Sequence, residues 1–66
     1  MVIIINGETK EFTDNITLGE LLKELSLETK VMAAAVNMNI VKQSEWQEYK
    51  LEDGDKLELL DFVGGG

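Results

Sequence analysis

The two most apolar strand-like segments of this 66-residue chain lie near its opposite ends. Val2–Ile5 is a continuous run of β-branched aliphatic residues, and Lys56–Phe62 contains three leucines and a phenylalanine. Apolar strands belong at the centre of a sheet, where both faces are covered. If these two segments lie side by side, the long connection between them makes them parallel. The polar strands of the chain must then form the edges of the sheet.

The first apolar run ends in a turn signal. Asn6-Gly7 is the dipeptide that most favours a tight β-hairpin. The segment after it, Glu8–Phe12, is polar except for Phe12, as suits an exposed edge strand. The sequence therefore predicts that the fold opens with a hairpin.

A helix is predicted to begin at Thr17. Thr17 and Glu20 have the spacing of a capping box, and Ile16 and Leu21 have that of a hydrophobic staple. Four leucines recur at the i, i+3, i+4 and i+7 spacing that places them on one helix face. They are Leu18, Leu21, Leu22 and Leu25, and we expect this stripe to pack on the sheet as core.

The second half of the chain predicts shorter elements. Ser44 and Gln47 form a weak capping-box pattern, which indicates a short helical turn that partly buries Trp46 in a structural role. The other expected elements are a strand at Val31–Val36, a turn at Asn37–Asn39, a small edge strand at Ile40–Val41 and a turn at Asp53–Asp55.

The order of these elements predicts an α+β chain with a β-grasp, or ubiquitin-like, fold. In that fold a mixed four- to five-stranded sheet packs on one main helix. At 66 residues we expect a single domain covering 1–66, with 63–66 as a flexible C-terminal tail.

Composition excludes several kinds of chemistry. The chain has no cysteine, histidine, arginine or proline, so we expect no thiolate nucleophile, disulfide, Ser-His dyad, ordinary zinc site or catalytic residue of its own. A net charge of −7 repels nucleic acid and favours basic protein partners. With no long apolar run and no secretion signal, we expect a cytoplasmic protein without a membrane contact. The acidic surface favours a chain that is monomeric when alone.

Alternation along the last strand cannot bury all of its apolar residues. If Leu57 and Leu59 face the helix, Leu60 and Phe62 lie on the outer face. An exposed apolar patch marks a contact site, so Leu60, Phe62 and Val63 are candidate docking residues. A β-bulge after Leu59 would instead turn them inward.

The sequence ends in Gly64-Gly65-Gly66, which composition alone does not explain. Residues 63–66 reach roughly 13 Å when extended. Gly64 and Gly65 lack a β-carbon and can thread a narrow channel, while Gly66 ends in a carboxylate able to attack the α-phosphate of ATP. The chain has no phosphate-binding loop, so another protein must adenylate it. The alternative is a flexible tail or a cloning remnant.

At this point the sequence resembles the sulfur carriers of thiamine biosynthesis, the ThiS family. The resemblance runs nearly end to end through six segments, whose order and spacing are more specific than any one of them. They are Val2–Gly7, Thr17–Leu22, Ala35–Asn37 leading to Ile40–Val41, Trp46, Asp53–Asp55 and the terminal glycines. Lys42-Gln43 departs from the family, in which many members have a proline and a basic residue there.

The resemblance implies that Gly66 is adenylated by an E1-like activating enzyme (ThiF) using ATP and converted to a thiocarboxylate. The sulfur would come from a cysteine desulfurase relay and pass to thiazole synthase (ThiG). No cofactor bound to the chain itself is implied. Three alternatives stay open: a sulfur carrier for molybdopterin or another pathway, a ubiquitin-like protein modifier, and a binding module whose tail has no chemistry.

Overall fold

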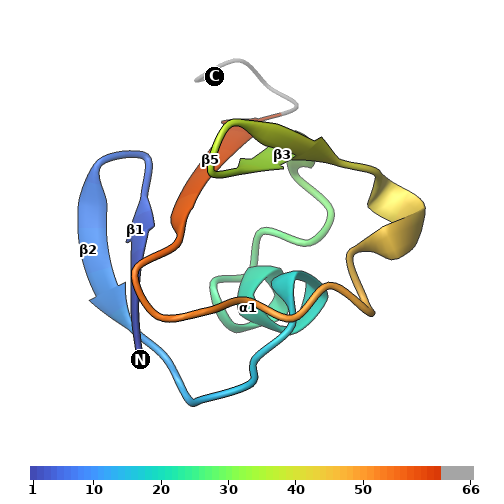
Figure 1. Cartoon of the computed structure of the whole chain (residues 1–66). Coiled ribbons are helices and arrows are strands. Elements are labelled where there is room, and N and C mark those ends of the chain that lie inside the picture. Colours follow the sequence, from blue (N-terminus) through green and yellow to red (C-terminus); the bar gives the residue numbers. More distant parts are fainter. Residues whose placement is uncertain (62–66) are drawn as a thin grey trace.

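The computed structural model describes residues 1–61, which form a mixed five-stranded sheet, one α-helix and a 3-10 turn (Figure 1). In chain order the elements are β1 (Val2–Ile5), β2 (Glu8–Glu11), α1 (Leu18–Glu24), β3 (Val31–Val36), β4 (Asn39–Val41), η1 (Gln43–Glu45) and β5 (Lys56–Asp61).

The two apolar strands lie side by side within the sheet. Its strand order is β2-β1-β5-β3-β4, with β1 and β5 parallel and every other neighbouring pair antiparallel. Ile4 is opposite Lys56, and Ile5 is opposite Leu57. The edges are β4 and β2, and all four residues of β2 are exposed. The predicted β-grasp fold is therefore confirmed.

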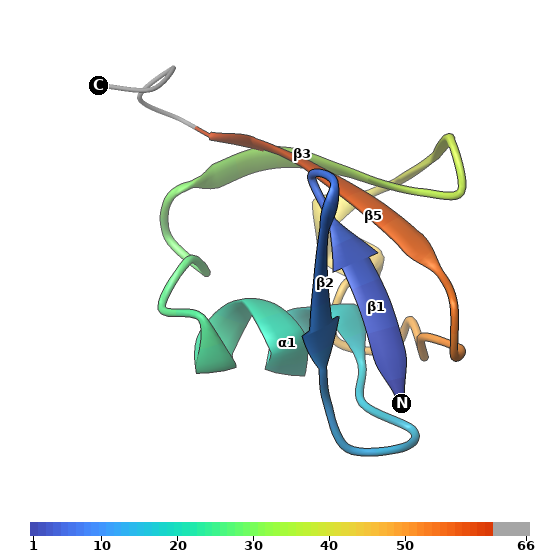
Figure 2. The ribbon, with the colours of Figure 1, turned by 90° about the vertical axis from the view of Figure 1, so that its left-hand side faces the viewer.

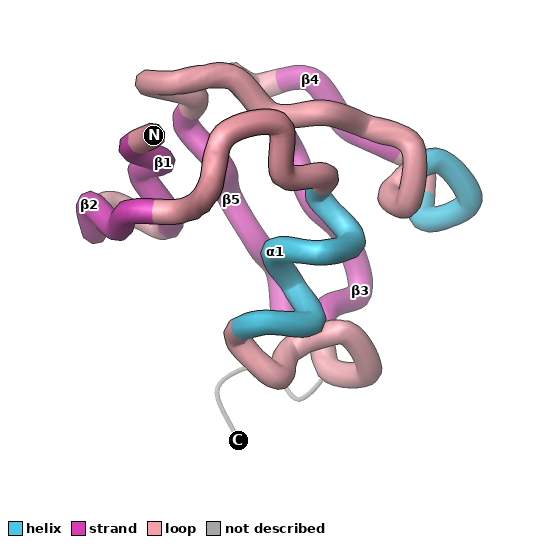
Figure 3. Tube along the Cα trace, turned by 90° about the horizontal axis from the view of Figure 1, so that it is seen from below, coloured by secondary structure: helices cyan, strands magenta, loops and turns pink. Residues whose placement is uncertain are grey.

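The helix forms where the capping pattern predicts it. Thr17 Oγ1 accepts a hydrogen bond from Glu20 N at 3.1 Å, and Glu20 Oε1 accepts one from Thr17 N at 2.9 Å. The sheet curls around α1, which covers one of its faces (Figure 2, Figure 3). Most of the leucine stripe is core, as expected, with Leu25 only partly buried. The side chains with no exposed surface are Ile3, Leu18, Leu21, Leu22 and Leu57.

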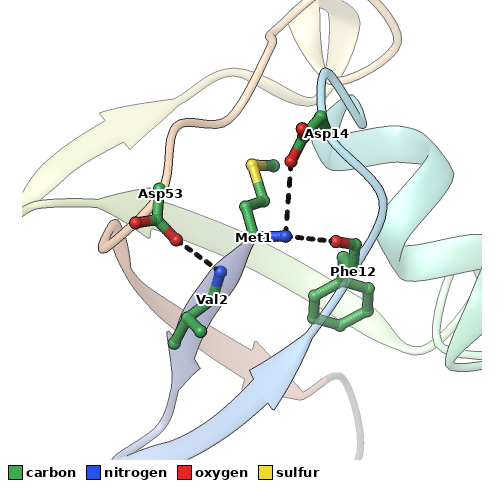
Figure 4. A network of polar contacts seen from close by, with 5 residues as sticks. All are labelled: Met1, Val2, Phe12, Asp14 and Asp53. Atoms are coloured by element: carbon green, nitrogen blue, oxygen red, sulfur yellow. Dashed lines mark hydrogen bonds and ion pairs between the residues drawn. The ribbon is translucent and has the colours of Figure 1, made fainter.

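The start of β1 is tied to two other parts of the chain (Figure 4). The α-ammonium group of Met1 donates a hydrogen bond to Phe12 O at 2.6 Å and lies 3.4 Å from the Asp14 carboxylate. Phe12 N donates back to Met1 O at 2.8 Å. Val2 N donates to Asp53 Oδ1 at 2.6 Å, which fastens the turn before β5 to β1.

Two turns have positive φ at both central residues, including Met38, a residue type that rarely adopts it. Asn6 and Gly7 have φ of 49° and 87°, and Asn37 and Met38 have φ of 50° and 72°. Positive φ at both central residues suits the twist of a two-residue hairpin. The first two strands and the β3–β4 pair are therefore joined as predicted.

The prediction around Ser44 is wrong in its details. The N-cap of the 3-10 turn η1 is Lys42, two residues before the predicted cap at Ser44, and it makes no side-chain capping bond; the turn itself begins at Gln43. Trp46 follows it and is buried more deeply than predicted, at 5% exposure. Its indole Nε1 donates to Val41 O at 2.9 Å, so the structural role predicted for this residue is confirmed.

Candidate functional site

The candidate site begins at the far end of β5. Of the docking residues inferred from the sequence, Leu60 lies within the described part of the chain. Phe62, Val63 and the three glycines of 64–66, including the expected sulfur-carrying Gly66, lie outside the described residues. The site can therefore be built from the structure as far as the strand that leads to them.

Strand β5 divides its side chains between the two faces of the sheet. Leu57 is fully buried and Leu59 is half-buried against the core, whereas Leu60 is 59% exposed. Leu60 is opposite Ala33 of β3. The ladder between β3 and β5 shifts register between Val31 and Ala33, so the irregularity lies on β3. A bulge that turns Leu60 inward is therefore excluded, and its predicted exposure is confirmed.

Leu60 borders a shallow apolar groove on the face of the sheet that α1 does not cover. Ile40 of β4, 73% exposed, stands on the other side. Ala35 is opposite Ile40, and Ala33 is opposite Leu60, so the short side chains of β3 lie between two large ones. We call this surface the alanine groove; it measures about 390 Å³ and is lined by Asn6, Ala33, Ala34, Ala35, Ile40, Glu58, Leu59 and Leu60.

Small residues on β3, which lies between β5 and β4, make this groove possible. A leucine at position 33 or 35 would fill the space between Ile40 and Leu60, because side chains opposite one another across strands are about 5 Å apart. Glu58 is exposed, lies opposite Ala35 and adds one carboxylate to the lining. The groove thus offers apolar contact area together with one negative charge.

Ile40 and the alanines of β3 are not among the site residues predicted from the sequence. The signal was present in the alternation of Val31–Val36, which places Ala33 and Ala35 on the same face. This alternation does not show which large side chains flank the alanines. The burial of Val41 in the structure does, because its neighbour Ile40 must then point to the outer face.

Within residues 1–61, no three acidic side chains gather closely enough to hold a metal ion. The same part of the chain contains no helix with the length and apolar character needed to cross a membrane.

The sequence was compared with the models of known protein families. The model of the ThiS family matches residues 3–66. The chain belongs to the ThiS family. The resemblance inferred from the segments of the sequence is thereby confirmed.

Two small members of the ThiS family match this chain over nearly all of their length. The sulfur carrier protein ThiS of Escherichia coli (strain K12) is 30% identical over 66 residues, which is 100% of both chains. The sulfur carrier protein ThiS of Bacillus subtilis (strain 168) is 35% identical over 63 residues, covering 94% of this chain and 96% of the relative.

A much longer relative and a solved structure extend the comparison. A thiazole synthase of Paramagnetospirillum magneticum is 39% identical over the 66 residues, and this chain spans 20% of that protein's length. The crystal structure of the thiamine biosynthesis protein (ThiS) from Geobacter metallireducens superimposes with a TM-score of 0.82 at 26% identity, with 100% of both chains covered. The described part of the chain therefore has the fold of a solved ThiS-family structure.

Proposed function

We propose that this ThiS-family chain is a sulfur carrier of thiamine biosynthesis and that its sulfur is held as a thiocarboxylate on Gly66. The observation that carries the proposal is the family match over residues 3–66, because it extends to the terminal glycines. Two relatives of similar length that are named sulfur carrier protein ThiS support the same role.

The chemistry takes place on the carboxylate of Gly66. A carboxylate oxygen attacks the α-phosphorus of ATP in an E1-like activating enzyme, pyrophosphate leaves, and a glycyl adenylate forms. A persulfide of a cysteine desulfurase relay then attacks the glycyl carbonyl carbon through its outer sulfur, and AMP leaves, which gives an acyl disulfide. A thiol next attacks the relay sulfur of this acyl disulfide, a new disulfide forms, and the thiocarboxylate of Gly66 is released. The carbonyl of a glycine is unhindered because the residue has no side chain. The chain is therefore a protein substrate and not an enzyme.

The chain contributes two things to the reaction: a surface that contacts the activating enzyme, and terminal glycines without side chains. The alanine groove, with Leu60 at its border, binds the activating enzyme, and Phe62 and Val63 extend this contact. Gly64 and Gly65 allow the end of the chain to enter an active site as a backbone without side chains. Contacts remote from the reacting atoms supply the energy that positions them, as in any substrate that binds through its body.

A thiazole synthase is the proposed acceptor of the sulfur. The support is the thiazole synthase of Paramagnetospirillum magneticum, which contains a region similar to the whole of this chain. A carrier and an acceptor within one polypeptide are held at high effective concentration, so a physical link between them is consistent with consecutive steps.

Deletion of Gly66 tests the proposal. With the activating enzyme and ATP, the full chain should support exchange of labelled pyrophosphate into ATP, and the chain ending at Gly65 should lose this activity by at least about a hundredfold, because an attacking group displaced by a residue's length cannot react. The shortened chain should unfold at the same temperature as the full one. Equal exchange by both chains would show that Gly66 is not the adenylated residue.

A further inference from the structure

Asn6 lies at the point where β1 turns away from β5. Its φ of 49° and the φ of 87° at Gly7 turn the chain back into β2. Asn6 N donates to Leu57 O at 2.9 Å, beyond the last registered pair of the two strands, Ile5 and Leu57. Strand β5 continues for four more residues, to Asp61, where β1 no longer lies beside it.

The side chain of Asn6 continues the pairing that the backbone of β1 ends. Its Oδ1 accepts a hydrogen bond from Leu59 N at 2.9 Å, and its Nδ2 donates to Leu59 O at 3.4 Å. A carboxamide carries the same donor and acceptor as a peptide group. Asn6 therefore adds one rung to the ladder and satisfies both backbone groups of Leu59 on this edge of β5.

The opposite edge of β5 is irregular just beyond this position. Leu60 is opposite Ala33 and Asp61 is opposite Val31, with the register shift of β3 between them. A bulge weakens a ladder locally because it leaves one residue unpaired. At the end of β5 the Asn6 carboxamide thus holds one side of the strand while the ladder on the other side is interrupted.

We infer that Asn6 is a positioning residue for the sulfur-carrying end of the chain. By fixing Leu59, it fixes the direction in which β5 presents Leu60 to the activating enzyme. The role rests on the proposed function, since it acts only if Gly66 is adenylated. Asn6 acts through Leu59: it reduces the number of orientations of the strand end among which the enzyme must select.

Two substitutions separate the parts of this role. Asn6→Gly keeps a residue that tolerates positive φ and removes both bonds to Leu59. Asn6→Asp keeps the acceptor for Leu59 N but loses the donor to Leu59 O. Asn15→Gly is the matched control, because Asn15 also has positive φ, at 67°, and lies in the loop before α1.

The experiment measures the kinetics of adenylation with the carrier as the varied substrate, together with hydrogen exchange at the Leu59 amide. For Asn6→Gly we expect exchange at Leu59 to rise and kcat to fall, each about three- to tenfold, as the loss of one or two hydrogen bonds implies. KM should change less than kcat, because Asn6→Gly removes one polar side chain from the lining of the alanine groove and leaves its apolar residues in place. Asn6→Asp should keep most of the Leu59 protection and give an intermediate kcat.

Three results would overturn the inference. A wild-type kcat for Asn6→Gly, measured on folded protein with Leu59 deprotected, would show that this bond does not position the end. Equal changes of kcat and KM in Asn6→Gly and Asn15→Gly would reduce the effect to general loss of stability. If the wild-type chain is not adenylated at all, the proposed function is wrong and the positioning role is wrong with it. If the wild type and Asn6→Gly are adenylated at the same rate, only the positioning role is wrong.

Discussion

Leu57 and Leu60 lie three residues apart on β5 and have different environments: one is in the core and the other is on the surface. Leu57 has no exposed area, while Leu60 is 59% exposed beside the short side chains of β3. A large apolar side chain left in water gains nothing for folding and is available for contact with another protein. The two positions therefore allow folding and docking to be separated experimentally.

Replacing Leu60 with serine should weaken docking and leave the fold intact. We expect the free energy of unfolding to change by less than about 0.5 kcal/mol, as for most surface substitutions. KM of the activating enzyme for the carrier should rise about fivefold or more, the effect of losing an apolar contact in the middle of an interface. Urea unfolding and adenylation kinetics measure the two quantities.

Leu57→Ala is the comparison for that variant. It should cost about 2–5 kcal/mol of stability, as buried leucines do, out of a total of roughly 3–10 kcal/mol for a domain of this size. If Leu60→Ser destabilised the fold to a similar degree while KM stayed constant, Leu60 would be a core residue and the docking role would be wrong.

At the level of elements, α1 depends on its ends as well as on its apolar face. Seven residues are too few for a stable isolated helix, so the capping box and the contact with the sheet must both contribute. Its first-turn Glu20 also interacts favourably with the positive end of the helix dipole.

Thr17→Ala should therefore lower the free energy of unfolding by about 1 kcal/mol. Thr17→Ser retains the hydroxyl that accepts from Glu20 N and should stay within a few tenths of a kcal/mol of the wild type. Denaturant unfolding of the three chains checks this. Indistinguishable stability of the alanine and serine variants would show that the cap bond contributes nothing.

The elements also show what the sequence could and could not predict. The Asn6-Gly7 turn, the start of α1 and the central position of β1 and β5 follow from local signals, which agree with the observed fold. The bond from Asn6 to Leu59 spans 53 residues and depends on the sheet order, so no local pattern indicates it. Ser44 has the spacing of a cap, but the competing start at Gln43 is the one that the fold uses.

For the molecule as a whole, residues 1–61 form a scaffold that, under the proposed function, offers a contact surface to the activating enzyme. The buried core, with Trp46 and the leucines of α1, holds β5 between β1 and β3. The exposed face of β3, β4 and β5 provides the alanine groove, and a net charge of −7 favours encounter with a basic surface of a larger enzyme. The core and the alanine groove thus share β5, the strand that precedes the terminal glycines in the sequence.

The intact mass of the carrier after sulfur loading tests the central claim most directly. The chain is incubated with the activating enzyme, ATP and a cysteine desulfurase with cysteine, and its mass is compared with that of the chain lacking Gly66. We predict that the full chain gains the mass difference between one sulfur and one oxygen atom, located at Gly66 by fragmentation, and that the shortened chain does not change. An unchanged mass of the full chain, with an enzyme that loads another carrier in parallel, would contradict the account.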